Sequence, residues 1–209
     1  MNQEISFKVA LSEGWRVTKS RFPLLLSYLG TVLALGAVRF AIEKPIDSTA
    51  LKVVLGLGFQ VLNWYLTFNA LGVSIKLIDG KEVVYADFWR PQNNFWFYVL
   101  ATLLYGLIIA SGTLLLVVPG IIFGLMFMFY GYVMVEKGLG PIEALKESKR
   151  LTRGVKWDLF LFSLIAIGLN ILGVMALIVG VLATMAVTYL ALAHLYRQRT
   201  RALESTPAA

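Results

Sequence analysis

Long runs of apolar residues constrain this chain more than any other feature of its sequence. The first run extends from Phe22 to Ile42, and the second from about Leu51 to Ile75. A helix needs about 20 apolar residues to cross the hydrocarbon core of a bilayer, and both runs reach that length. Charged residues make up 15% of the chain, against about 25% in soluble domains. The sequence therefore predicts an all-α membrane protein rather than a soluble domain with a large core.

A third apolar run is too long for a single crossing. The chain is almost uncharged from Phe95 to Val135, and Pro119 with Gly120 lies near the middle of this run. A Pro–Gly pair favours a break in a helix. We therefore expect two spans here, at about Phe95–Val118 and Ile121–Val135.

The last apolar run, from Leu159 to Leu195, also exceeds one crossing, and glycines predict a break between Gly173 and Gly180. The whole pattern predicts six transmembrane helices arranged as three hairpins. Nearly all of the nineteen Lys and Arg residues then fall on the side of the N-terminus; Lys44 and Lys52 are on the outer side and Arg39 is in the first span. Because basic loops stay in the cytoplasm, both termini are expected there.

Composition also limits the classes of function. The net charge of +7 is explained by the basic cytoplasmic side, so we expect contacts with anionic lipid headgroups there and no nucleic-acid partner. The chain has no cysteine, and it contains no phosphate-binding loop, nucleophile elbow or metal-ligand cluster. The single histidine, His194, is expected to be an interfacial hydrogen-bonding group. We therefore expect no catalytic site, no cofactor and no metal.

A short basic segment occurs twice, as ALSEGWRVTKS at Ala10–Ser20 and as ALKESKRLTRG at Ala144–Gly154. Ala, Leu, Glu, Arg and Thr share the same offsets in both copies, and each copy has one stripe of apolar and small residues at helical spacing. We expect two amphipathic helices on the inner leaflet, each leading into a span. A weaker third version is Tyr85–Trp96. The basic residues expected to face the inner leaflet are Arg16, Lys19, Lys146, Lys149, Arg150 and Arg153.

These elements predict a single transmembrane domain built from an amphipathic segment and a hairpin, used three times. The expected parts are an N-terminal amphipathic helix (1–21), hairpin 1 (22–75), an inner loop (76–94), hairpin 2 (95–135), a basic amphipathic helix (136–156), hairpin 3 (157–196) and a cytoplasmic tail (197–209).

A few polar residues lie within the expected spans. Arg39 is close to the outer end of the first span, where Glu43 would be its partner and its side chain would reach the outer headgroups. Asn63 and Asn69 lie in the second span and Asn170 in the fifth. Hydrogen bonds between helices account for most such amides. The functional alternative is a polar cavity or headgroup site formed by these residues.

Three motifs carry a resemblance to a known family. They are Pro119-Gly120-Ile121 after an apolar helix, the helix Glu143–Gly154, and Leu195–Gln198 at the end of the last hairpin; the segment Ile78–Trp89 resembles the family's inner loop. With these motifs the chain resembles bacterial integral membrane proteins related to the membrane domain of glycerophosphoryl diester phosphodiesterases. The resemblance implies a multi-pass protein of the bacterial cytoplasmic (inner) membrane. It does not imply phosphodiesterase activity, because it includes no soluble catalytic domain.

Two hypotheses of function follow. The first is a non-enzymatic, lipid-interacting scaffold or the membrane subunit of an assembly, with a membrane-protein partner. The alternative is a small transporter or a protein that handles a lipid or another amphiphile, with a cavity between its hairpins. A continuous cavity that reaches Asn63 would favour the alternative, and an apolar, filled centre would favour the scaffold.

Overall fold

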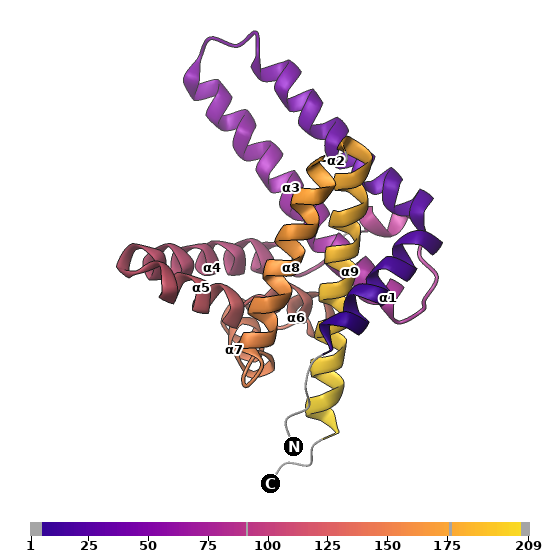
Figure 1. Ribbon diagram of the computed structural model, residues 1–209. Coiled ribbons are helices and arrows are strands. Elements are labelled where there is room, and N and C mark those ends of the chain that lie inside the picture. The colour runs from indigo at the N-terminus through magenta and orange to yellow at the C-terminus, as the bar shows by residue number, and fades with distance from the viewer. Residues whose placement is uncertain (1–5, 91, 176, 206–209) are drawn as a thin grey trace.

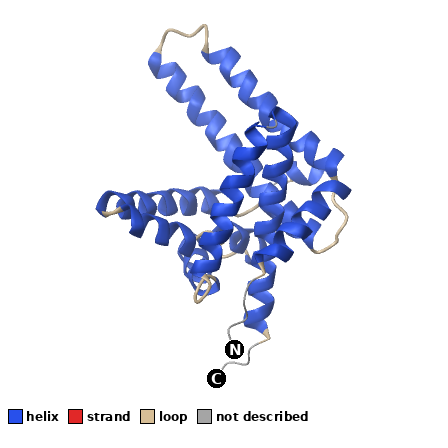
Figure 2. Cartoon of the chain, viewed as in Figure 1, coloured by secondary structure: helices blue, strands red, loops and turns tan. Residues whose placement is uncertain are grey.

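A computed structural model describes residues 6–90, 92–175 and 177–205, with side chains described from residue 180 onward in the last segment. These residues form helices and loops, without a strand among them (Figure 2). The elements are α1 (Phe7–Ser20), α2 (Phe22–Glu43), α3 (Thr49–Ile78), the 3₁₀ helix η1 (Tyr85–Trp89), α4 (Phe95–Leu115), α5 (Val117–Met126), α6 (Tyr130–Lys137), α7 (Pro141–Leu151), α8 (Lys156–Met175) and α9 (Leu177–Glu204).

Five stretches of the described residues are long and apolar enough to cross a membrane. They are α2, α3, α4, the stretch Val117–Lys137 that comprises α5 and α6, and α8. These helices fit the predicted all-α membrane protein. The predicted sixth span corresponds to α9, which is not among the five, so six crossings and cytoplasmic termini stay predictions. α9 also continues to Glu204, so the first part of the expected tail is helical.

The three hairpins α2–α3, α4–α5 and α8–α9 diverge from a common base instead of forming a parallel bundle (Figure 1). We call this base the hub; it consists of α1, η1, α6 and α7 with the adjoining ends of α3, α4, α8 and α9. Most buried side chains lie in the hub. By contrast, Leu114 at the tip of the second hairpin is 89% exposed, and Phe40 at the tip of the first is 70% exposed. Apolar tips of this kind fit contact with lipid.

The turn of the second hairpin lies earlier than the sequence predicts. α4 ends at Leu115 and α5 begins at Val117, so Pro119 is in the first turn of α5. A proline is tolerated there because that turn has no helical acceptor for its N–H. A Cβ at Gly120 would lie 3.1 Å from the Cα of Thr113. The Pro–Gly pair therefore starts the returning helix and lets it approach α4, rather than forming the turn.

The predicted fourth span is interrupted by a turn between α5 and α6, and α7 supports this turn. Ser148 accepts a hydrogen bond from the backbone N of Phe129 (3.1 Å) and donates one to the carbonyl O of Met126 (3.2 Å). Thr152 donates to the same carbonyl at 3.0 Å. These bonds satisfy backbone groups that the interruption leaves without helical partners.

Both copies of the repeated segment form helices, and their stripes are buried in the hub. The buried stripe residues are Ala10, Gly14, Val17 and Thr18 of α1, and Ala144, Leu145, Ser148 and Leu151 of α7. α1 packs along α9 so closely that a Cβ at Gly14 would lie 2.7 Å from the carbonyl O of Val187. Both stripes therefore contact other helices of the protein.

The weaker third version of the segment, Tyr85–Trp96, does not form a comparable helix. Its described residues include η1, which ends at Trp89, and the first two residues of α4, and Arg90 has an extended backbone with ψ 128°. Arg90 precedes a proline in the sequence, and a residue in that position disfavours the helical conformation. Only two of the three expected amphipathic segments are therefore α-helices.

Candidate functional site

Two adjoining cavities lie along the first hairpin. One, of about 150 Å³, lies between α2, α3 and α9. The other, of about 110 Å³, lies between α2 and α3. Val32 and Asn63 line both, and we call the two together the groove. The apolar walls of the larger cavity include Leu25, Leu29, Val73, Met185, Ala186 and Leu190.

The charged side chain of the groove lies at its other end. Arg39, Gln60 and Asn63 line the smaller cavity. Arg39 donates from Nε to Oε1 of Glu43 at 3.0 Å, and Asn63 accepts a bond from the hydroxyl of Thr67 at 3.3 Å. The structure thus brings Arg39 and Asn63, from different helices, to one cavity.

The other two predicted amides lie elsewhere. Asn170 donates to the hydroxyl of Thr188 at 3.2 Å, which is a hydrogen bond between α8 and α9. Asn69 is 1% exposed and lines a different pocket, in the hub. The four candidate residues therefore do not converge on a single cavity.

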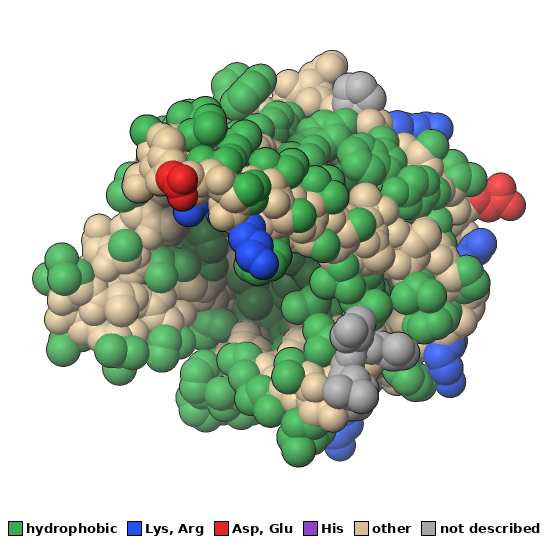
Figure 3. All heavy atoms as spheres, turned by 90° about the horizontal axis from the view of Figure 1, so that it is seen from above, with side chains coloured by type: hydrophobic (Ala, Val, Ile, Leu, Met, Phe, Trp, Pro, Cys, Tyr) green, Lys and Arg blue, Asp and Glu red, His purple; other side chains and the backbone are tan. Residues whose placement is uncertain are grey.

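A wider hollow is visible when the molecule is seen from above (Figure 3). It lies between the lobe that α4 and α5 form on the left and the rest of the molecule, and most side chains around it are hydrophobic. The divergence of the hairpins thus leaves apolar faces that other helices of this chain do not cover.

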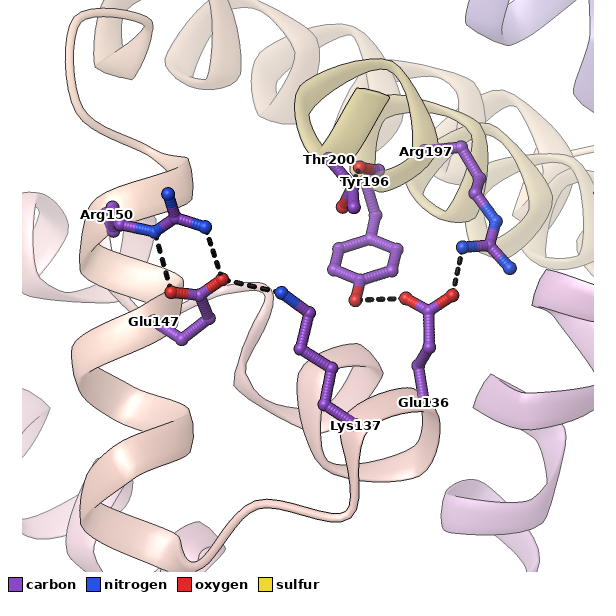
Figure 4. A network of polar contacts seen from close by, with 7 residues as sticks. All are labelled: Glu136, Lys137, Glu147, Arg150, Tyr196, Arg197 and Thr200. Carbon is purple, nitrogen blue, oxygen red and sulfur yellow. Dashed lines mark hydrogen bonds and ion pairs between the residues drawn. The ribbon is translucent and has the colours of Figure 1, made fainter. Parts of the chain in front are cut away.

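A network of charged groups joins three helices at the hub. Arg197 of α9 lies 2.5 Å from Oδ2 of Asp79, at the end of α3, through Nη2, and contacts Glu136 of α6 through Nη1. The hydroxyl of Tyr196 donates to the same Glu136, and Figure 4 shows both side chains pointing to its carboxylate. Within the described residues, no group of three or more His, Cys, Asp or Glu side chains could hold a metal ion. The network therefore fixes helix ends and presents a polar surface.

Glu147 ties α7 to α6 beside this network (Figure 4). Its carboxylate accepts two bonds from Arg150, both 2.7 Å, and one from Lys137 at 2.7 Å. The hydrogen bonds from Arg150, together with those from Lys137, lower the pKa of Glu147 to about 2. Glu147 is therefore charged throughout the physiological range.

The basic residues of the repeated segment face outward from the hub. All six of the predicted ones are exposed: Arg16, Lys19, Lys146, Lys149, Arg150 and Arg153. Nζ of Lys19 lies 5.4 Å from the ring centre of Trp15, which is itself 49% exposed. Trp157, which follows α7, is 69% exposed. Exposed tryptophans beside cations are typical of a membrane–water boundary.

Sequence reasoning missed the structural roles of Arg197 and Arg199. Arg199 donates from Nε to the carbonyl O of Leu151 (2.9 Å) and from Nη2 to that of Arg153 (3.0 Å), at the end of α7. Nothing in the sequence separates it from the other basic residues near the C-terminus. For Arg197 a signal existed, because Asp79 and Glu136 also lie at expected inner span ends.

Part of this chain is similar to a known protein family. Residues 101–203 match the family described as "Protein of unknown function (DUF975)". The match begins within α4 and ends within α9. It therefore includes most of the second hairpin, α7 and the third hairpin, whereas α2 and α3, which form most of the groove, lie outside it.

Three uncharacterized proteins are similar to this chain, one from Mycobacterium bovis and two from strains of Mycobacterium tuberculosis. Their identities are 31%, 31% and 30%, each over 112 residues. The alignments cover 51% of this chain and 34% of each relative, so the chain spans about a third of their length. None of these matches supports the expected relationship to glycerophosphoryl diester phosphodiesterases. No solved structure matches the chain.

Proposed function

We propose that this chain is a non-enzymatic, multi-pass protein of the bacterial cytoplasmic membrane that binds a phospholipid in the groove. The observation that carries this proposal is the division of the groove into a mainly apolar part between α2, α3 and α9 and a part that contains the charged Arg39. A phospholipid has the same division between acyl chains and headgroup. The groove thus favours the amphiphile-handling alternative over a scaffold with a filled centre.

The predicted orientation gives the lipid a direction. With the N-terminus in the cytoplasm, α2 runs outward, so Arg39 lies near the outer surface and Leu25 nearer the hub. The phosphate of an outer-leaflet lipid would then lie beside Arg39, and an acyl chain would follow Leu29 toward Leu190. The planar guanidinium suits this role because its donors match phosphate oxygens.

The exposed cations of α1 and α7 support a second part of the proposal, namely contact of the hub with the anionic inner leaflet. Attraction to such a surface contributes about 1 kcal/mol for each nearby Lys or Arg. Lys146 and Lys149 on α7 and Arg153 just after it are exposed, while the stripe of α7 is buried in the hub. The same face would serve a scaffold that binds an acidic segment of a membrane-protein partner.

Native mass spectrometry of the full chain, released from bacterial membranes in mild detergent, tests lipid binding. We expect wild type to retain phospholipid and Arg39→Gln to lose most of it. Lys44→Gln is the matched control, because Lys44 is an exposed outer cation that does not line the groove. Glu43→Gln, which frees Arg39 from its partner, should retain at least as much lipid as wild type.

Equal retention of phospholipid by wild type and Arg39→Gln would overturn the groove proposal. A stoichiometric protein partner in place of lipid, lost when Lys146 and Lys149 are both changed to Gln, would favour the scaffold.

A further inference from the structure

A polar pocket of about 490 Å³ opens on the hub beside the groove, with which it shares Val73. α3, η1 with the segments on either side of it, α6 and α9 contribute to its walls. The residues that matter for its chemistry are Asn69, Lys76, Lys81, Asp87, Glu136 and Arg197. A second pocket of about 570 Å³ shares Lys81, Glu136 and Arg197 with it. These shared residues stand at the most charged part of the hub.

The charge of this pocket is positive. Its lining includes four basic residues and two carboxylates: Lys76, Lys81, Arg90 and Arg197, with Asp87 and Glu136. Both carboxylates already have protein donors, because Asp87 accepts from the backbone N of Val84 and from Lys76, and Glu136 accepts from Tyr196 and Arg197. Lys81 is exposed and has no ion-pair partner within the described part of the chain. Lys76 and Arg90 pair with Asp87, and Arg197 pairs with Glu136 and also with Asp79, so the positive charge that remains for a ligand is that of Lys81.

Two buried polar groups of the same pocket have no partner among the described residues. The side chain of Asn69 is 1% exposed, and neither its Oδ1 nor its Nδ2 makes a hydrogen bond. Nε of Arg197 is also buried and unpaired, although both terminal nitrogens of this residue bind carboxylates. Buried polar groups in folded proteins nearly always have partners. Two unpaired buried polar groups at one pocket indicate that a bound ligand supplies their hydrogen-bond partners.

We propose that this pocket binds an oxyanion of the phosphate class. Oxyanion oxygens would accept from Nε of Arg197 and from Nδ2 of Asn69, directly or through a bridging water, while Lys81 supplies a mobile positive charge. The same chemistry would recognise free phosphate or the phosphomonoester of a lipid headgroup that reaches the hub. The polar groups of this site are separate from the groove, since Asn69 and Arg197 do not line the groove, although Val73 lines both.

Thermal unfolding of the full chain in detergent, with inorganic phosphate as the probe and chloride at matched ionic strength as the reference, tests the proposal. Phosphate should raise the Tm of wild type by several degrees, because a ligand that binds only the folded state stabilises it. Asn69→Leu and Lys81→Gln should each lose most of this rise. Asn63→Leu, on the same helix but in the groove, should keep it.

Because Lys81 is exposed, Lys81→Gln should fold even if Asn69→Leu does not. Asn69→Leu without phosphate should unfold at or above the wild-type Tm, since it removes an unpaired amide. If inorganic phosphate has no effect, native mass spectrometry after incubation with nanodiscs of phosphatidylcholine plus phosphatidic acid decides between the two sources. Phosphatidic acid retained by wild type and lost in Lys81→Gln identifies a lipid headgroup. No specific response to either probe, or equal responses in wild type and Lys81→Gln, overturns the proposal.

Discussion

Two helices of the hub, α1 and α7, carry the same stripe but use it differently. Gly14 of α1 and Ser148 of α7 occupy equivalent positions in the repeated segment. At Gly14 the missing side chain lets α1 lie against the backbone of α9. At Ser148 the hydroxyl binds both ends of the interruption between α5 and α6. The choice of glycine or serine at this one position therefore decides whether the helix is held by close packing or by hydrogen bonds.

The threonine one turn later follows the same division. Thr18 donates to the carbonyl O of Gly14 in its own helix at 2.7 Å. Thr152 also reaches Met126, outside its helix. The stripe therefore attaches α1 to the hub by close packing and α7 by hydrogen bonds. The basic residues of both helices face outward.

Gly14→Ala should produce the largest loss of stability. The added Cβ would lie 2.7 Å from the carbonyl O of Val187. Relieving this overlap requires a shift of α1 against α9, and both helices are packed in the hub. We expect a loss of about 2–3 kcal/mol, as for overpacking of a close contact. The midpoint of chemical unfolding in detergent measures it.

Gly30→Ala is the matched control for this prediction. No atom lies within 4 Å of a Cβ built at Gly30, so the substitution should be neutral or slightly stabilising through its helix propensity. Equal effects of the two alanines would contradict docking of α1 by shape.

Ser148→Ala should have the next largest effect. It leaves the buried N–H of Phe129 without its partner, whereas Met126 keeps the bond from Thr152. The expected loss is about 1–2 kcal/mol, the cost of one unsatisfied buried donor. Hydrogen exchange at the Phe129 amide should also become faster, and unchanged exchange there would argue against support of the turn by α7.

Acid should weaken α7 through Glu147. The folded pKa of about 2 lies below the ordinary value of 4.5, so the stabilisation by this carboxylate is complete above pH 4.5 and disappears as the pH falls toward 2. Glu147→Gln should remove this part of the pH dependence and cost about 1–2 kcal/mol at pH 7, because charged hydrogen bonds are lost. Unfolding midpoints of wild type and Glu147→Gln between pH 7 and pH 3 measure both effects. A constant difference over this range would contradict the assignment.

The sequence predicted features that depend on local pattern. Apolar run length located the hairpins, and helical spacing identified the buried stripes of α1 and α7. The position of Pro141 at the start of α7 and of Gly154, with φ +83°, after its end also follows from local backbone preference. These features need no knowledge of distant residues.

Features that depend on distant partners could not be predicted. The residues between Met126 and Tyr130 are apolar and contain no proline, and the interruption there is supported by Ser148 and Thr152. For Arg197 the sequence places Asp79 and Glu136 on the same expected side of the membrane, but it does not show which groups pair, because the contact with Asp79 joins residues more than a hundred positions apart. For the groove, the sequence placed Arg39 and Asn63 on neighbouring spans but could not exclude Asn69 from the same cavity, because small shifts in helix rotation decide which side a residue faces.

The smallest expected effect belongs to the equivalent carboxylate of α1. Glu13 has one basic partner, Arg16, whose side chain is 71% exposed, whereas Glu147 has two partners and is itself 15% exposed. The hydrogen bond from Arg16 lowers the pKa of Glu13, but solvent screens an exposed pair of this kind. Glu13→Gln should therefore leave the unfolding midpoint at pH 7 within experimental error of wild type. A loss as large as that of Glu147→Gln would show that α1, like α7, depends on its charges, and the contrast between the two copies would then rest on Gly14 and Ser148 alone.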